Sequence, residues 1–336
     1  MKNVICIGSS SKDIFFPTKE GAVSETPGDI KAQKKITFEL GAKFHIDNRY
    51  ESLGGCAANV SAGLARLGVP SACYTNVGDD LVGEWIKKEI SKEGVDANLI
   101  MAEVNCLSGL SAIVVDEKSG DRIIFSNQEA NEKLKIIPEK LKETQWISVS
   151  DPSGDWKGVL ETVMKISKEN GVKIAFNPRG KNIQEDAKKV YEIAGGTEVF
   201  FVNKDEAIEI ISHNTQHITH NDLNNEEFLI KELKKTGVKV AVVTDGSRGA
   251  WAYNGEILVF AKALVENPKD TTGAGDAFSS GFLAAYIQGK GLEECLKWGT
   301  ANGGSAVNFY GGVEGLLREK EIIEKISKIK TQFIGE

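Results

Sequence analysis

The sequence predicts an α/β protein: a three-layer α/β/α arrangement with a mainly parallel central sheet, joined by a small additional β-sheet. Short runs rich in β-branched residues alternate along the chain with longer segments of helical period, which is typical of βαβ units. Glycine closes several of the helical segments, as at Gly94, Gly171 and Gly237. Two further stretches interrupt the alternation with extended patterns, and these indicate the additional sheet.

The elements of the central layer follow one another in order. Strands are expected at residues 3–8, 71–78, 146–150, 173–177, 198–203 and 239–246, and helices at 58–68, 81–94, 156–171 and 226–237. In the helix at 156–171, the spacing of Val159, Leu160 and Val163 places the three side chains near one face. Strands that regularly alternate with helices predict parallel pairing, with helices on both faces of the sheet.

The additional sheet is expected to come from two insertions, at about residues 14–53 and 104–128. The first is extended and mixes polar with apolar residues, and the second alternates like a hairpin that turns at Lys118 to Gly120. We interpret them as strands of one small sheet that stands off the main domain, although they could instead extend the edge of the central sheet. Residues 1–336 are expected to form a single domain.

Composition excludes several classes of function. The chain has 336 residues, 41% of them hydrophobic, which is enough to bury one large core. A net charge of -7 gives no support to binding of nucleic acid or an anionic membrane, and no stretch approaches the roughly 20 apolar residues of a membrane span. Five widely spaced cysteines without a C-x-x-C pair favour a reduced, cytoplasmic setting.

The stretch KDTTGAGDAFSSGF, from Lys269 to Phe282, combines a glycine-rich turn with the start of a further helix, near Asp276. Backbone amides at such a turn bind anions, and the helix macrodipole adds to their effect. The chain has no Walker A motif, and the turn only approaches a dinucleotide-binding fingerprint because Phe278 replaces the third glycine and Asp276 would repel a pyrophosphate. An anion hole at Gly273, Ala274 and Gly275 beside a carboxylate therefore needs another explanation.

Phosphoryl transfer supplies that explanation. Its charge-dispersed transition state is stabilised by fixed donors, while a carboxylate accepts the proton of the attacking hydroxyl. The amides of residues 273–275 would hold the phosphoryl oxygens and Asp276 would act as general base. The alternative is that Asp276 only caps the helix.

Six segments together resemble the ribokinase-like carbohydrate kinases, also called the phosphofructokinase B family. DTTGAGDAFSSGF resembles the C-terminal signature of the family, and LGGCAANVSAGLARLG, from Leu53 to Gly68, resembles the N-terminal one. GSSSKD, NKDE, TDGSRGA and ANGGSA are similar to its substrate turn, N-x-x-E motif, nucleotide loop and late helix. The resemblance spans nearly the whole chain and implies the ribokinase-like fold.

The resemblance assigns roles to residues of these segments. It implies substrate binding by Asp13, Gly54, Gly55 and Asn59, nucleotide binding by Asn203, Glu206, Thr244, Asp245, Gly246, Ser247, Gly249 and Asn302, and a monovalent cation, K⁺, at Asp270 and Thr272. Asn203 and Glu206 would position the Mg²⁺-bound triphosphate through water. An amide such as that of Asn59 can donate and accept toward hydroxyls, and the carboxylate of Asp13 suits a diol. Asp151 is a further candidate for contact with the substrate.

The implied activity is ATP-dependent phosphorylation of a hydroxyl, with Mg²⁺, on a sugar of the ketose or pentose type. A nucleoside is the alternative acceptor. A different class of function is also possible on this fold, namely a regulator that binds a ligand without catalysis. The two insertions would form a lid that excludes water when it closes, and the lids of the family favour a homodimer. Four aromatic residues of the insertions could cover a sugar face or pack the lid: Phe38, Phe44, Tyr50 and Phe125. Three basic residues could converge as a clamp for a substrate phosphate: Lys43, Arg49 and Arg122.

His213, His217 and His220 have a spacing that could line one helix face and bind zinc. Asn, Thr and Gln fill the gaps between them, and no acid stands near to orient the imidazoles. We therefore interpret the segment as a solvated loop or helix end rather than a metal site.

Overall fold

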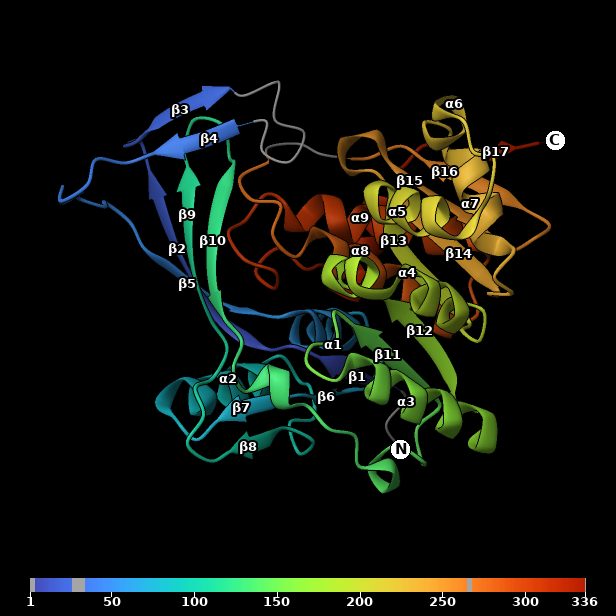
Figure 1. Ribbon diagram of the computed structural model, residues 1–336, viewed down its shortest axis with the longest axis horizontal. Helices are drawn as coiled ribbons and strands as arrows, with labels where there is room; N and C mark the ends of the chain where they lie inside the picture. Colours follow the sequence, from blue (N-terminus) through green and yellow to red (C-terminus); the bar gives the residue numbers. More distant parts are fainter. Residues whose placement is uncertain (1–3, 26–33, 265–267, 336) are drawn as a thin grey trace.

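A computed structural model describes residues 4–25, 34–264 and 268–335 of the chain. Its large sheet, seen at the centre of Figure 1, has nine strands in the order β17-β16-β15-β14-β13-β12-β11-β1-β6. These are β6 (Ser71–Tyr74), β1 (Val4–Gly8), β11 (Trp146–Ser150), β12 (Lys173–Asn177), β13 (Val199–Asn203), β14 (Val240–Thr244), β15 (Ala250–Tyr253), β16 (Leu258–Ala261) and β17 (Thr331–Ile334). The first six of these pair in parallel and the last three are antiparallel, which confirms the mainly parallel sheet.

One predicted strand is two strands in the structure. The stretch 71–78 divides into β6 and β7 (Asn76–Gly78), and β7 leaves the large sheet to pair with β8 (Met101–Glu103). The hydroxyl of Thr75, at the break, is held by Asn131, which also accepts from the backbone of Ser10. These bonds turn the chain out of the sheet directly beside the end of β1.

Helices cover both faces of the large sheet. Along β1 the side chains alternate, so that Val4 and Cys6 enter one core and Ile5 and Ile7 enter the other. The first core contains α1 (Cys56–Arg66), α2 (Leu81–Lys92), α8 (Ala274–Ile287), α9 (Leu292–Ala306) and α10 (Glu319–Ile326); the second contains α3 (Trp156–Asn170), α4 (Gly180–Ala194), α5 (Lys204–Asn214) and α7 (Glu226–Lys234), and α6 (His220–Leu223) lies beside α7. The three-layer prediction is thus confirmed.

Helices α4 and α5 were not among the elements expected from the sequence. In α4 the apolar residues Ile183, Ala187, Val190 and Ala194 keep helical spacing through the kink at Asp186, so the signal for this helix was present in the sequence and was overlooked. Helix α5 begins from a capping box between Asn203 and Glu206.

The four strands β2 (Ser11–Thr18), β5 (Tyr50–Gly54), β9 (Leu110–Asp116) and β10 (Arg122–Asn127) form a second sheet in the order β10-β9-β2-β5. We call this sheet the lid. It stands away from the large sheet (Figure 1), so the alternative that its strands extend the large sheet is wrong. Strands β9 and β10 form the predicted hairpin, and β3 (Ala22–Glu25) pairs with β4 (Lys34–Thr37) alone; residues 26–33 of the first insertion lie outside the described residues.

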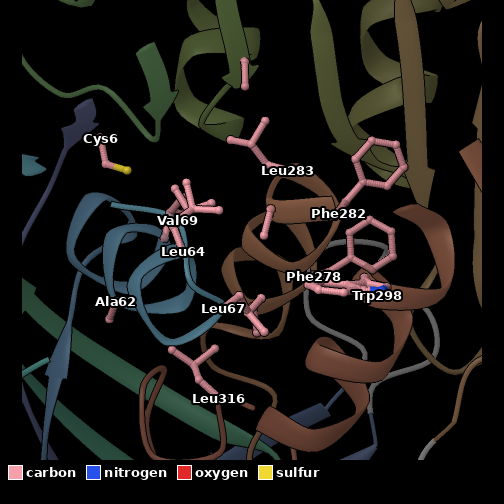
Figure 2. Packing of buried hydrophobic residues seen from close by; sticks show 14 of the residues in the cluster. Cys6, Ala62, Leu64, Leu67, Val69, Phe278, Phe282, Leu283, Trp298 and Leu316 are labelled. Carbon is pink, nitrogen blue, oxygen red and sulfur yellow. The ribbon is translucent and has the colours of Figure 1, made fainter. Parts of the chain in front are cut away.

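Helices α1 and α8 pack against each other in the first core. Figure 2 shows Leu64 of α1 and Leu67, the residue that caps its end, beside side chains from α8 and α9, among them Leu283, Phe282 and Trp298. The two helices approach so closely at Gly63 that a Cβ there would lie 2.2 Å from Oγ of Ser280. This approach sets the position of the first turns of both helices.

Candidate active site

The carboxyl ends of the parallel strands meet at one edge of the large sheet, where ligands of such sheets usually bind. Asp151 follows β11, Arg179 follows β12 after a short turn, Asn203 ends β13 and Thr244 ends β14. The chain leaves β1 at the same edge and enters the lid through β2, which begins at Ser11. The site therefore lies between this edge, the lid and the start of α8.

Helix α8 begins from the glycine turn. Gly273 is its N-cap with a left-handed backbone (φ 74°), and no side chain caps the helix. The first amides of a helix have no partner within it, so the turn offers donors to an anion. The amide of Ala274 also donates to the carbonyl of Thr271 in a long hydrogen bond (3.3 Å). Because Asp276 lies inside the first turn and makes no capping bond, the hypothesis that it only caps the helix is wrong.

The carboxylate of Asp276 is held from the other helix. The Nδ2 of Asn59, on α1, donates to Oδ2 of Asp276 at 2.9 Å, although the two residues are 217 positions apart. Asn59 precedes Gly63 by one helical turn and Asp276 precedes Ser280 by one turn, so the close approach of the helices brings this pair together. The Oδ1 of Asn59 is buried without a hydrogen-bond partner among the described residues.

Asn302 does not join the site. It is fully buried on α9, where Nδ2 donates to the carbonyl of Ala277 (2.8 Å) and Oδ1 accepts from the amide of Leu317 (2.8 Å). With both ends of the amide satisfied by the protein, Asn302 fixes α8 against α9 and has no group left for a nucleotide.

Asp276 is well suited to accept a proton. It is only 7% exposed, and burial raises its pKa above the usual range for an aspartate, while the hydrogen bond from Asn59 opposes this rise. A raised pKa makes a carboxylate a stronger base at neutral pH. The thiol of Cys56 lies within hydrogen-bonding reach of Asp276, and burial raises the pKa of this thiol as well, so that it stays neutral.

Asp151 lies beside this pair. Its backbone is left-handed (φ 50°), which is strained for an aspartate and is typical of functional sites. Burial raises the pKa of Asp151 to about 6; the charge of Arg179, whose Nε lies 3.2 Å from Oδ1, opposes the rise, and Asp276 adds to it. The charge of Asp276 thus acts on Asp151, which agrees with the position of Asp151 at the end of β11 on the site edge of the large sheet.

Asp13 lies on the inner face of the lid, at the entrance from β1. It is 5% exposed and accepts a hydrogen bond from Ser11 (2.8 Å), and burial raises its pKa. Gly54 lies directly under its carboxylate: a Cβ on Gly54 would stand 2.1 Å from Oδ2 of Asp13. The next residue, Gly55, is the N-cap of α1. The four predicted substrate residues therefore lie at the junction of β2, β5 and α1.

The predicted triphosphate residues line one cavity at the ends of β13 and β14. Its walls are Asn177, Phe201, Val202, Asn203, Glu206, Thr244, Gly275 and Phe278. Burial raises the pKa of Glu206 to about 7, and the charge of Asp151 contributes to this shift. Glu206 is partly buried and has no ion pair within the described residues, and such a carboxylate fits Mg²⁺, which prefers oxygen ligands and keeps several waters. Gly275 brings the anion turn to the same cavity.

The loop after β14 is organised by charge. Gly246–Arg248 form a short 3₁₀ turn that contains Ser247, and Gly249 follows it. The carboxylate of Asp245 is paired with Arg248 and lies 3.9 Å from Nζ of Lys204, so it stabilises the loop rather than facing the cavity with free oxygens. Thr244 is the member of this loop that lines the cavity.

No group of three or more His, Cys, Asp or Glu side chains within 4–25, 34–264 and 268–335 is arranged to hold a metal. His213 lies in the last turn of α5, His217 has a left-handed backbone (φ 61°) and His220 begins α6, so the three residues do not share one helix face. The interpretation of this segment as a loop and helix end is confirmed. All five cysteines are free, and no helix in the described part of the chain could span a membrane.

Comparison with known proteins agrees with this geometry. The sequence profile described as pfkB family carbohydrate kinase matches residues 22–317, which include both glycine motifs and the general-base candidate. The chain belongs to the pfkB family. It is accordingly an ATP-dependent kinase, a phosphotransferase of the sugar and nucleoside kinase group.

Individual relatives of this pfkB kinase are distant. The ribokinase of Haemophilus influenzae is 26% identical over 309 residues, which cover 88% of this chain and 96% of the relative. A putative ribokinase II from E. coli, solved with ATP and Mg²⁺, has a TM-score of 0.77 at 23% identity and covers 98% of this chain and 100% of its own. A nucleoside kinase of Burkholderia thailandensis, solved with inosine, has a TM-score of 0.76 at 16% identity, with coverage of 97% and 98%. These structural likenesses confirm the ribokinase-like fold.

Sequence reasoning missed Arg179 in this pfkB kinase. Its guanidinium pairs with Asp151 and donates to Oγ of Ser153 (3.2 Å). A signal was present, because Arg179 comes two residues after a predicted parallel strand, at the edge where the other site residues lie. Cys56 was not expected at the site either: it lies within the glycine motif, and the packing of α1 on α8 brings its thiol within reach of Asp276.

Proposed function

We propose that this pfkB kinase phosphorylates a hydroxyl of an unphosphorylated sugar of the ketose or pentose type, with Asp276 as general base. The observation that carries the proposal is the chemical type of the side chains on the acceptor side of the site, where β1, β2 and α1 meet the start of α8. Asp13, Asn59, Asp151 and Asp276 offer carboxylate and amide oxygens, which suit the hydroxyls of a neutral polyol.

The cations near the acceptor side are already paired, and this weighs against a phosphorylated substrate. Arg179 pairs with Asp151, Arg122 lies 3.7 Å from Asp270, and Lys12 pairs with Glu51 at 2.7 Å. Arg49 also pairs with Glu51, at the exposed side of the lid, so the convergence of Lys43, Arg49 and Arg122 into a phosphate clamp finds no support. A substrate phosphate would need a free cation, preferably a bidentate arginine.

In the proposed reaction, the acceptor hydroxyl is bound between Asp13 and Asn59 and gives its proton to the carboxylate of Asp276. Its oxygen bonds to the terminal phosphorus of ATP while the bond from that phosphorus to the oxygen of ADP breaks. The amides of residues 273–275 receive the charge that spreads over the phosphoryl oxygens. Asn203 and Glu206 would hold Mg²⁺ through water, and the metal would neutralise phosphate charge.

A screen of ADP release over unphosphorylated ketoses and pentoses, nucleosides and sugar phosphates, each with Mg²⁺, tests the proposal. We expect the highest kcat/KM in the first set, with the Asp276→Asn variant as the background control. A nucleoside with a kcat/KM well above that of every sugar would show that the acceptor is a nucleoside instead of a sugar. Absence of turnover with every acceptor would favour the non-catalytic regulator.

The outer face of the lid favours a homodimer. In the register of β2, β9 and β10, Ile14, Ala112 and Phe125 lie opposite one another, on the face away from Asp13, and Phe125 is 65% exposed. Phe125 therefore cannot cover a sugar, and Phe38 and Phe44 pack on each other instead. An apolar sheet face with an open edge strand suits a second copy of the chain in a two-fold pairing.

We expect Phe125→Asp to convert the dimer into a monomer, because the charge would lie at the centre of the paired lids. Light scattering after gel filtration measures the mass. Phe333→Asp is the matched control, since Phe333 is also exposed (42%) but lies on β17, at the far edge of the large sheet. A monomeric wild-type chain at micromolar concentration would contradict the proposal.

A further inference from the structure

The lid contacts the body of the molecule at its inner face and at the tip of its hairpin. Tyr310 of the body inserts beneath the lid, with its ring 4.8 Å from that of Tyr50 and 5.9 Å from that of Phe15. At the hairpin turn, Gly120 lies next to the carbonyl of Lys269, and a Cβ on Gly120 would stand 3.5 Å from that oxygen. The lid thus reaches the segment that leads directly into the anion turn.

Arg122, the first residue of β10, extends this contact with a charged group. Its Nη1 donates to the hydroxyl of Thr271, and its Nε lies 3.7 Å from Oδ1 of Asp270. The second distance is too long for a hydrogen bond, so the contact with Asp270 is ionic. Thr271 and Asp270 immediately precede the turn at Gly273, and the carbonyl of Thr271 accepts from the amide of Ala274.

The resemblance to known kinases implied a monovalent cation at Asp270 and Thr272, and the residues present do not fit one at the carboxylate. Oδ1 of Asp270 accepts from the amide (2.9 Å) and hydroxyl (2.7 Å) of Thr272, and Oδ2 accepts from the amide of Gly311 (3.1 Å). Asp270 is 1% exposed, so its charge needs a partner close by. The guanidinium of Arg122 already provides it, and a second cation at this carboxylate would be repelled.

We propose that Arg122 is a positioning residue that takes the place of a monovalent cation: from the lid, it neutralises Asp270 and fixes Thr271, and thereby orders the anion turn for phosphoryl transfer. The inference deepens the proposed kinase function and rests on it. It makes the anion turn dependent on the lid, because the charge that balances Asp270 arrives only when β10 lies against the body. Acceptor binding under the lid is in this way coupled to the phosphate side of the site.

The test compares Arg122→Ala and Arg122→Lys with Arg49→Ala, whose arginine stands next to β5, is 63% exposed and, among the described residues, pairs with Glu51 of the lid. Activity is measured with K⁺ and with tetramethylammonium in its place, at equal ionic strength. We expect the wild-type kcat to change less than about twofold when K⁺ is removed, and Arg122→Ala to lose about tenfold or more in kcat. Free guanidinium or K⁺ at millimolar concentration should restore part of this loss, which a purely structural defect would not allow.

A readout without an acceptor separates this inference from the proposed function. Calorimetric titration with Mg²⁺ and a non-hydrolysable ATP analogue should show weaker binding by Arg122→Ala, again restored by K⁺, whatever the acceptor is. Strong activation of the wild type by K⁺, or an Arg122→Ala variant that matches Arg49→Ala in both assays, would overturn the role of Arg122. Failure of every acceptor in the screen, with the calorimetric contrast intact, would overturn the proposed reaction and leave the effect of Arg122 on the anion turn standing.

Discussion

Asp276→Asn is expected to abolish turnover while leaving the fold and nucleotide binding nearly unchanged. The amide has the size of the carboxylate and can still bond to Asn59, but it cannot take a proton from the acceptor hydroxyl. Loss of a general base typically costs about 10²- to 10⁴-fold in rate. Steady-state kinetics give kcat, and calorimetric binding of an ATP analogue shows that the site is still formed.

Asp155→Asn is the matched control for this substitution. Asp155 is a true N-cap, whose Oδ1 accepts from the amide of Gly158 (3.1 Å) at the start of α3. Asparagine caps as well as aspartate, so this variant should keep full activity. An Asp276→Asn enzyme with more than about a tenth of the wild-type kcat, against the loss expected for a base, would return Asp276 to a structural role.

Gly273→Ala is the second substitution with a large expected effect. Gly273 has φ 74°, and a Cβ there would lie 2.5 Å from Cα of Gly312, which is backbone and cannot move aside alone. The anion turn must therefore shift, and a displacement of about 1 Å in a catalytic group can cost about 10²-fold in rate. We also expect the free energy of unfolding to fall by about 2 to 4 kcal/mol, since strain and overlap add together. Kinetics and urea unfolding measure the two effects.

Gly171→Ala separates strain from overlap. Gly171 ends α3 with nearly the same backbone angle (φ 70°), and a Cβ there would meet nothing within 4 Å. This control should lose only about 1 kcal/mol, the usual cost of a left-handed alanine, and should keep its activity. Equal stabilities of the two variants, together with an unchanged kcat in Gly273→Ala, would show that the turn tolerates a side chain and does not depend on this close approach.

The sequence alone was enough for the local features of the fold and the site. The strands at 146–150 and 173–177 were predicted with the bounds that the structure has, because β-branched runs between turn residues determine them within a few positions. The glycine turn and Asp276 were found for the same reason: the left-handed residue, the free amides and the carboxylate all lie within one helical turn of chain.

Contacts between distant segments depended on the tertiary structure. Asn59 and Asp276 were each expected at the site, but their hydrogen bond exists because α1 and α8 approach closely at Gly63. Asn302 belongs to a segment that resembles a family motif, but it lies inside the core. Both ends of its side-chain amide are hydrogen-bonded to the protein there. The contact between Arg122 and Thr271 joins residues 149 positions apart.

The chain's own sequence therefore determined the fold class, the anion turn and the chemical type of the site residues, which depend on periodicity and on neighbours along the chain. The tertiary structure decided which charges are paired: Arg179 with Asp151 and Arg122 with Asp270. Electrostatic partners are set by distances across the packed core and the lid, and no local pattern records these distances, because a single shift in helix packing would change them all.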